Sequence, residues 1–187
     1  MAFSIKGLFP SKPKRSKRKL TWEPLSAYKS KILICGYDKV GKTTLAQRLF
    51  GIDTSKGEES PHHATIYSVN YSYEEESYPL EIWDVQGSQT DGTINAGLYA
   101  DTRVALIVVD CANTNSLNLV NFYFDNMKFL KNCKMYLVLN KADDGICREV
   151  TESEFQEEAS NYELEYFEVS ALNGTGIDEL RRAIFRK

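Results

Sequence analysis

Apolar runs of strand length alternate along the chain with segments whose apolar residues repeat at helical spacing. In the segment 115–130, for example, Leu117, Val120, Phe124 and Met127 lie on one helical face. Strands are predicted at residues 31–35, 65–73, 78–85, 104–109, 134–139 and 166–169, and helices at 44–50, 115–130, 152–160 and 176–185. Strands that alternate with helices favour an α/β fold, in which a doubly wound, mostly parallel sheet is covered on both faces.

The first predicted strand runs directly into residues 36–43, GYDKVGKT, which fit the pattern GxxxxGK followed by Ser or Thr. A strand before this loop and a helix after it are the context that phosphate binding needs. The glycines allow a tight turn that points backbone amides at a polyphosphate. Lys42 would reach the β and γ phosphates, and the Thr43 hydroxyl would ligate Mg²⁺. The alternative is a chance match in a turn that contains glycine.

Further motifs end other predicted strands, where doubly wound sheets bind their ligands. Residues 83–87, WDVQG, place Asp84 where it can hold a Mg²⁺ shell, usually through water, and Gly87 where its amide can meet a γ phosphate. Alone, this motif is a weak signal, because a strand that ends in Asp and Gly is more often followed by a plain turn.

Residues 140–143, NKAD, carry the chemistry of base selection. The Asp143 carboxylate can accept hydrogen bonds from both the N1 hydrogen and the exocyclic amine of guanine, a donor pair that adenine lacks. The Lys141 stem can lie along the base plane. Residues 170–172, Ser-Ala-Leu, end the last predicted strand, and a backbone amide there could meet the guanine O6, with an ordinary turn as the alternative.

Length and composition favour one domain, because 187 residues with 42% hydrophobic content can bury one good core. No apolar run approaches the roughly 20 residues that span a bilayer, and no signal-peptide pattern opens the chain, so we expect a soluble, intracellular protein. The four cysteines show no metal-binding spacing and are expected to be buried reduced thiols: Cys35, Cys111, Cys133 and Cys147.

Charge is distributed unevenly along the chain. Residues 1–31 carry nine basic residues and one acidic residue, a net charge of +8, which leaves −11 for residues 32–187 out of the total of −3. We therefore divide the chain into a flexible basic arm, residues 1–29, and a globular domain, residues 30–187.

The arm places apolar residues ahead of the basic run 12–19, and two prolines prevent one continuous helix: Phe3, Ile5, Leu8 and Phe9, with Pro10 and Pro13. An apolar foot followed by basic residues suits contact with an anionic membrane through residues 1–19, at about 1 kcal/mol per basic residue near the surface. A nuclear-import or nucleic-acid-binding tail is the weaker alternative, and a disordered soluble arm is the simplest.

In these motifs the chain resembles the Ras superfamily of small GTPases. GYDKVGKT, WDVQG, NKAD and SAL stand in that family's order and at closely similar spacings, over residues 30–187. The resemblance implies a P-loop NTPase fold with a six-stranded sheet and about five helices, binding of GTP and GDP with Mg²⁺, and two switch loops that read the γ phosphate. Asp38 and the Trp-Asp-Val sequence look like the Arf branch, whereas residues 113–117 and 170–176 look more like Rab or Ras proteins.

The resemblance also implies roles for individual residues. The nucleotide-binding set is Gly36, Asp38, Lys39, Val40, Gly41, Lys42, Thr43, Thr44, Asp84, Gly87, Asn140, Lys141, Asp143, Ser170, Ala171 and Leu172. The metal-binding set is Thr43, Thr65 and Asp84, and the catalytic set is Lys42, Thr65, Gly87, Ser88 and Gln89. Implied partners are effectors, an exchange factor and an activating protein, acting on a monomer.

The chain departs from the family at the hydrolytic position. Most members have a glutamine after the Asp-x-x-Gly motif that orients the attacking water. Here Ser88 stands at that position, Gln89 follows one place later, and Gln86 replaces a small residue inside the motif. Because serine is too short to reach the water, we predict slow intrinsic GTP hydrolysis. The bulky pair Asp38 and Lys39 could also obstruct the arginine that an activating protein inserts.

The first of the two switch loops, switch I, is expected to supply one metal-binding threonine. We predict that this residue is Thr65, which precedes an apolar strand. Thr54 lies too close to the first helix, and Ser60 has the better spacing but weaker flanks. The neighbouring His62 and His63 are assigned no function, because adjacent histidines in a loop are usually solvated.

The termini bear on membrane attachment. The arm is similar to the Arf N-terminal segment, but Ala2 occupies the position where myristoylation needs glycine. The chain as given ends without a cysteine for prenylation, although a longer chain could carry one. We predict a cytoplasmic GTP-binding switch, peripheral on the cytosolic face of a membrane, that acts in membrane traffic or signalling. The alternative is a GTP-binding interaction module without hydrolysis.

Overall fold

A seven-stranded sheet forms the centre of the computed structural model, which describes residues 29–87, 96–143 and 147–186. Its strands are β1 (Ser30–Gly36), β2 (Glu58–Ser60), β3 (Ala64–Tyr73), β4 (Glu76–Val85), β5 (Thr102–Asp110), β6 (Lys134–Asn140) and β7 (Glu165–Glu168). They lie side by side in the order β2-β3-β4-β1-β5-β6-β7. The five strands from β4 to β7 in that order are parallel, and only the hairpins of β2, β3 and β4 are antiparallel.

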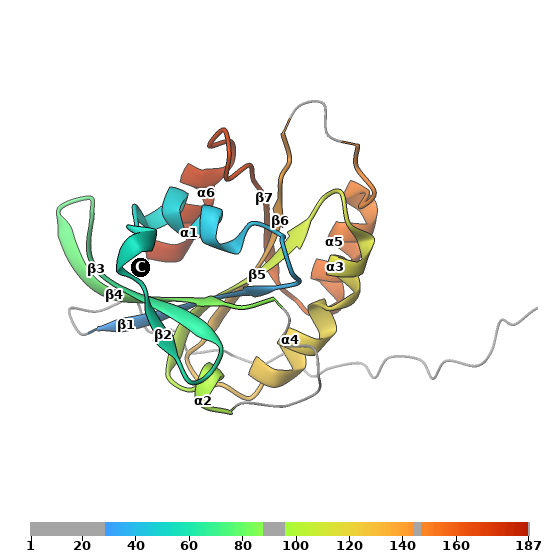
Figure 1. Cartoon of the computed structure of the whole chain (residues 1–187). Coiled ribbons are helices and arrows are strands. Elements are labelled where there is room, and N and C mark those ends of the chain that lie inside the picture. Colours follow the sequence, from blue (N-terminus) through green and yellow to red (C-terminus); the bar gives the residue numbers. More distant parts are fainter. Residues whose placement is uncertain (1–28, 88–95, 144–146, 187) are drawn as a thin grey trace, which may run out of the picture.

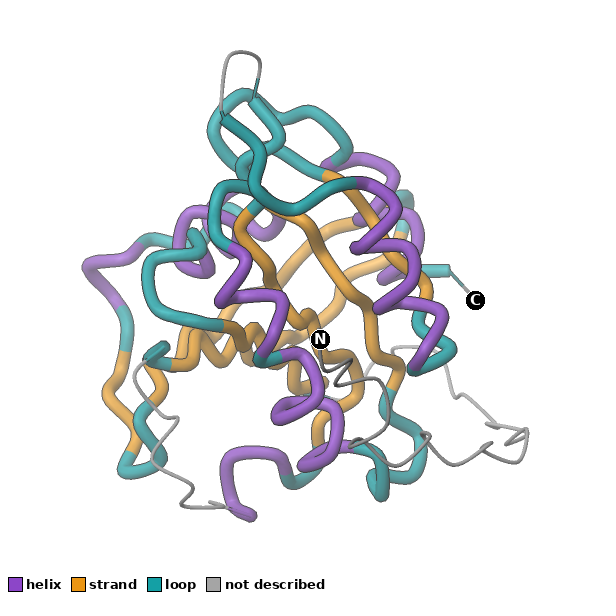
Figure 2. Tube along the Cα trace, turned by 90° about the vertical axis from the view of Figure 1, so that its right-hand side faces the viewer, coloured by secondary structure: helices purple, strands orange, loops and turns teal. Residues whose placement is uncertain are grey.

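Helices cover both faces of this sheet (Figure 1). The helical elements of the described residues are α1 (Lys42–Phe50), the 3-10 turn η1 (Thr54–Lys56), α2 (Ala96–Tyr99), α3 (Thr114–Asn118), α4 (Val120–Met127), α5 (Glu152–Asn161) and α6 (Ile177–Phe185). Helices α1 and α6 pack on one face, and α2, α4 and α5 pack on the other. The view in Figure 2 shows the strands twisting between these two helical layers. The predicted α/β architecture is confirmed.

The core follows from strand alternation. In β1, Ile32 and Ile34 belong to the apolar cluster beneath α1 and α6, whereas Leu33 and Cys35 belong to the cluster beneath the opposite helices. A strand that is apolar at every position is what a sheet covered on both faces requires. Cys35, Cys111 and Cys133 are buried, as expected, whereas Cys147 is exposed.

Three local features differ from the sequence prediction. The polar segment 51–64 contributes a short edge strand, β2, which makes seven strands within the described residues where six were expected. The predicted helix 115–130 is interrupted at Leu119, which ends α3 and starts α4. The short helix α2 was not predicted. Such features depend on pairing with distant residues, which local patterns do not encode.

Some predictions lie outside the described residues. The basic arm, residues 1–28, is one of them, and so are Ser88 and Gln89. Among the helices that the structure describes, none has the length and apolar character needed to cross a bilayer.

Candidate functional site

The carboxyl ends of β1 and β4 open into a cavity of about 620 Å³. Its lining combines the loop after β1, the start of α1, the start of β3 and the end of β4 with the two residues after it: Asp38, Lys39, Gly41, Lys42, Thr43, Thr44, Thr65, Asp84, Val85, Gln86 and Gly87. Most of the residues predicted to bind phosphates and metal therefore line one cavity. The predicted base-binding residues belong to the neighbouring ends of β6 and β7.

The loop between β1 and α1 requires its two glycines. Gly36 has φ 147° and Gly41 has φ 91°, both in the region that favours glycine. A Cβ atom on Gly36 would lie 2.3 Å from the Val108 carbonyl oxygen, and one on Gly41 would lie 2.5 Å from Asn140 Nδ2. The spacing of glycines in the motif thus reflects two close approaches of the backbone to neighbouring strands.

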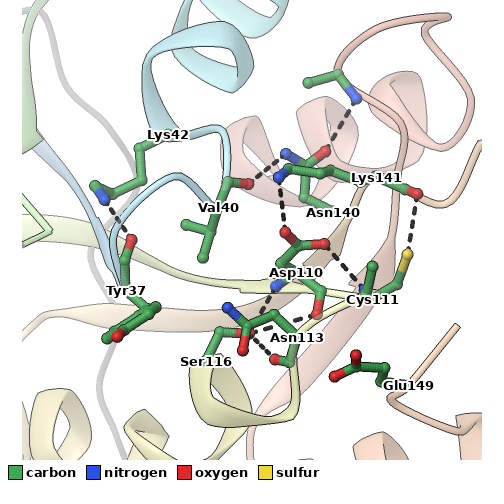
Figure 3. A network of polar contacts seen from close by, with 12 residues as sticks. Tyr37, Val40, Lys42, Asp110, Cys111, Asn113, Ser116, Asn140, Lys141 and Glu149 are labelled. Atoms are coloured by element: carbon green, nitrogen blue, oxygen red, sulfur yellow. Dashed lines mark hydrogen bonds and ion pairs between the residues drawn. The ribbon is translucent and has the colours of Figure 1, made fainter.

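Lys42 closes the loop on itself. Its Nζ donates a hydrogen bond to the Tyr37 carbonyl oxygen at 2.7 Å, which Figure 3 shows. It donates a second to the Gly36 carbonyl oxygen at 3.1 Å. Burial lowers the pKa of Lys42, and the Asp84 carboxylate opposes that shift. Because an ammonium group has three donors, Lys42 can hold the loop and still donate to a phosphate.

Asp84 and Thr43 form a site suited to a hard cation. The Thr43 hydroxyl donates to Asp84 Oδ2, while Asp84 Oδ1 is buried and has no hydrogen-bond partner among the described residues. Burial raises the pKa of Asp84, whereas Thr43 and Lys42 lower it. A buried carboxylate oxygen beside a hydroxyl is a donor set that Mg²⁺ prefers. The two residues therefore fit the predicted metal.

Gly87 lies directly against the phosphate-binding loop. A Cβ atom at this position would come within 2.5 Å of both the N and Cα atoms of Asp38. Only glycine allows the end of the Asp84 motif to approach the loop this closely. The backbone after β4 consequently borders the cavity where a terminal phosphate would sit.

Thr65 lies in β3, in one row with two carboxylates. It pairs with Glu59 of β2 and with Asp84 of β4, and its hydroxyl donates to Glu59 Oε1 at 2.9 Å. Thr65 lines the cavity. The alternative Ser60 lies in β2 and accepts from the His62 amide, and Thr54 lies in η1. The assignment of Thr65 as the switch I threonine stays a prediction.

Asn140 joins the loop to the base side. Its Nδ2 donates to the Val40 carbonyl at 2.9 Å, and its Oδ1 accepts from the Ala171 amide at 3.0 Å (Figure 3 shows both contacts). The side chain is 1% exposed. One buried amide thus connects three motifs that are far apart in the sequence.

Asp143 and Ser170 are also in contact. The Ser170 hydroxyl donates to Asp143 Oδ1 and accepts from the Asn173 amide, and the Ala142 amide donates to the Val169 carbonyl. Leu172 is largely exposed beside them. These contacts bring together the carboxylate and the segment 170–172, which were predicted to share the guanine base.

Lys141 is held by a residue that the sequence analysis missed. Lys141 Nζ lies 2.7 Å from Asp110 Oδ2, and the other oxygen of Asp110 accepts from the Ala112 amide (Figure 3). Asp110 is the last residue of the apolar strand β5, and Asp84 likewise lies near the carboxyl end of β4, so this shared position could have identified it. The Lys141 stem lies near Gly41 of the loop, since a Cβ atom on Gly41 would come within 3.9 Å of Lys141 Cε.

Two more missed residues support the site from helices. Arg48 of α1 donates from Nε to the Ala171 carbonyl at 3.0 Å and from Nη2 to the Leu172 carbonyl. The Tyr123 hydroxyl of α4 donates to the Gly36 carbonyl at 2.9 Å. Neither residue has a local sequence signal, because each partner lies more than 80 positions away.

Beneath the Asp84 motif, a buried lysine packs on a tryptophan. Lys31 Nζ lies 3.5 Å from the ring centroid of Trp83 and donates to the carbonyls of Leu98, at 2.7 Å, and Ala100, at 3.1 Å. Burial lowers the pKa of Lys31 to about 8. The His62 ring stacks near the same indole, with centroids 6.4 Å apart. This cluster ties α2 to the sheet.

Comparisons with known proteins identify a family for the chain. Residues 31–187 match the model of the Ras family. The chain is also similar to the Ras-related protein Rab-4 of Dictyostelium discoideum, with 31% identity over 160 residues, which cover 82% of this chain and 76% of that relative.

Proposed function

Because the chain belongs to the Ras family of small GTPases, we propose that it is a switch that binds GTP and GDP with Mg²⁺ and hydrolyses GTP slowly. The observation that carries this proposal is the Asn140 side chain, which bonds to the phosphate loop and to the segment 170–172 at once. A phosphate site and a base site joined in this way suit a single guanine nucleotide. Asp143 would accept from the guanine N1 hydrogen and amine, which disfavours adenine.

Each phosphate-side residue has a role in this proposal. Lys42 would balance charge on the β and γ phosphates, and Thr43 and Asp84 would hold the metal, with Thr65 assigned as a further ligand. A bound Mg²⁺ neutralises charge that develops on the phosphate oxygens. The Gly87 amide meets the γ phosphate, so the segment after β4 responds to its loss.

Hydrolysis is an in-line attack of water on the γ phosphorus. The bond from the water oxygen to phosphorus forms while the bond from phosphorus to the β-γ bridging oxygen breaks, which yields GDP and phosphate. Ser88 stands where relatives of this kind carry glutamine, and Gln89 is displaced by one residue, so the attacking water is poorly oriented. Slow turnover gives a long-lived GTP state.

The cellular setting is proposed from family membership and the arm. We assign the protein to membrane traffic or signalling, where effectors, an exchange factor and an activating protein would read and reset its state. The basic residues 1–19 would bring a monomer to anionic lipid on the cytosolic face of a membrane. A second candidate, a GTP-binding interaction module without turnover, is favoured by Ser88 and by Asp38 at the cavity.

Single-turnover hydrolysis of GTP by purified protein tests the proposal, with nucleotides identified by chromatography and Ser88→Gln run in parallel. We expect slow release of GDP that accelerates by about tenfold or more in Ser88→Gln, because the amide restores contact with the water. A rate that does not rise would contradict the role given to Ser88. GTP recovered unchanged from both proteins would favour the interaction module.

A further inference from the structure

Gln86, which belongs to the motif of residues 83–87, lines the nucleotide cavity. Its backbone amide donates to the His63 carbonyl at 2.9 Å, which continues the pairing of β3 and β4 by one residue. Side chains alternate along an extended segment, so Gln86 emerges on the same side as Asp84. The side chain is exposed and lines the cavity together with Lys42, Thr65 and Gly87.

Glu59 determines which end of the Gln86 side-chain amide faces it. Glu59 Oε2 lies 3.5 Å from Gln86 Nε2, and Glu59 Oε1 accepts from the Thr65 hydroxyl at 2.9 Å. An ionised carboxylate only accepts hydrogen bonds, so the NH₂ group of Gln86 must be the end turned toward it. The amide oxygen of Gln86 is then left as an acceptor.

We propose that Gln86 orients the attacking water in this protein, in place of the glutamine that Ser88 replaces, and that Glu59 is a positioning residue that acts through Gln86. This inference rests on the proposed function, because it names the residue that catalyses the slow hydrolysis proposed above. The Gln86 amide oxygen accepts a hydrogen bond from the water but takes no proton. The proton passes to an oxygen of the released phosphate as the bond to GDP breaks.

The chemistry of the cavity favours a neutral amide for this task. Glu59 and Asp84 already place two carboxylates on the row of side chains that borders the cavity. A third anion would repel a terminal phosphate, whereas an amide offers an acceptor without a charge. Gln86→Glu should therefore weaken binding of GTP more than binding of GDP, and should not support hydrolysis.

Hydrolysis of GTP loaded beforehand tests the inference, because loading separates chemistry from binding. We expect Gln86→Ala to slow the single-turnover rate by about 10-fold to 100-fold, and Glu59→Gln to slow it less. Gln156→Ala is the matched control, because Gln156 Nε2 donates to Glu152 on α5, at an exposed Gln–Glu pair in another part of the chain. Release of labelled GDP should stay within about twofold in all three variants.

A second measurement separates catalysis from simple support of the β2–β3 hairpin. GDP with aluminium fluoride mimics the phosphoryl group in transfer, so Gln86→Ala should lose affinity for this complex while keeping its affinity for GDP. If Gln86→Ala released GDP faster and had lower thermal stability but hydrolysed GTP at the normal rate, Gln86 would have only a structural role. That result would overturn the inference.

The outcomes also separate this inference from the proposed function. If the unaltered protein hydrolyses GTP and Gln86→Ala matches Gln156→Ala, the inference is wrong and the GTPase proposal stands. If the unaltered protein leaves GTP intact while binding it, slow hydrolysis fails and the inference fails with it. If the rate of GTP hydrolysis falls in Gln86→Ala and Glu59→Gln but not in Gln156→Ala, the result supports both the inference and the GTPase proposal.

Discussion

The two ends of the nucleotide site are held in different ways. On the base side, Asn140 is buried and joins two backbone segments, and Asp143 contacts Ser170. On the terminal-phosphate side, Glu59 and Gln86 are exposed, and their contacts depend on β2, an edge strand of three residues. Contacts of the second kind open at low free-energy cost. We therefore expect the base side to be held by the fold itself, and the terminal-phosphate side to consist of parts that a ligand can rearrange.

The strand environment explains this difference. β6 pairs along its length with β5 and also with β7, so the backbone of Asn140 at the end of β6 is held in place. β2 pairs only with β3 among the described strands, over three residues. Pre-organised groups bind with a smaller loss of conformational entropy, which favours affinity on the base side.

The largest expected effect follows from removing the buried amide on the base side. Asn140→Ala leaves the Val40 carbonyl and the Ala171 amide without their partner, at about 1–3 kcal/mol for each buried group. Affinity for GTP and GDP should fall together, by about 100-fold or more, as measured with labelled nucleotides. Asn161→Ala, at an exposed asparagine that donates to Glu158, is the control. Equal affinities in the two variants would show that the base side is not pre-organised.

The next effect concerns the metal. Asp84→Asn removes the negative charge beside Thr43, so Mg²⁺ should bind at least about tenfold more weakly. In the unaltered protein, chelation by EDTA should accelerate release of labelled GDP, and in Asp84→Asn release should already be fast and insensitive to EDTA. Asp125→Asn, at an exposed ion pair with Lys128, should behave as the unaltered protein. Normal EDTA sensitivity in Asp84→Asn would exclude Asp84 from the metal site.

A smaller and more selective effect is expected at the terminal-phosphate side. Thr65→Ala should weaken the affinity for GTP by about three- to tenfold relative to GDP, since the hydroxyl assigned as a Mg²⁺ ligand in the GTP state is lost. The same change at Ser60 tests the alternative residue. If Ser60→Ala, and not Thr65→Ala, changes the ratio of GTP to GDP affinity, the switch I threonine role passes to Ser60.

The smallest effect is a pH dependence at Lys31. Burial lowers its pKa from 10.5 to about 8, so between these values the unfolded state binds a proton that the folded state does not. Stability of the unaltered protein relative to Lys31→Met should therefore rise with pH across this window, by on the order of 2 kcal/mol. Chemical denaturation at several pH values measures this difference, and Lys131→Met at an exposed position controls for loss of charge. A flat difference would mean that Lys31 keeps its proton in the fold.

Much of the site was predictable because its motifs are short and local. Lys42 follows the glycine loop after β1, and Asp84 and Asn140 lie at the carboxyl ends of β4 and β6. Parallel strands end at one edge, so local patterns were enough to predict that these residues lie together. The partners of these residues were not predictable in the same way. Arg48 reaches residues 171 and 172, Asp110 reaches Lys141, and β2 forms only because it pairs with β3. Such contacts depend on the packed fold rather than on neighbouring residues.

Trp83 also gives the protein an intrinsic optical reporter. The chain has two tryptophans, Trp22 and Trp83. The ring of Trp83, one residue before Asp84, lies near both the Lys31 ammonium and the His62 imidazole. Indole fluorescence responds to nearby charge and to stacked rings, so any shift of the β2–β3 turn should change the emission wavelength or intensity of Trp83. In a Trp22→Phe variant, exchange of GDP for GTP could then be followed in real time without a label.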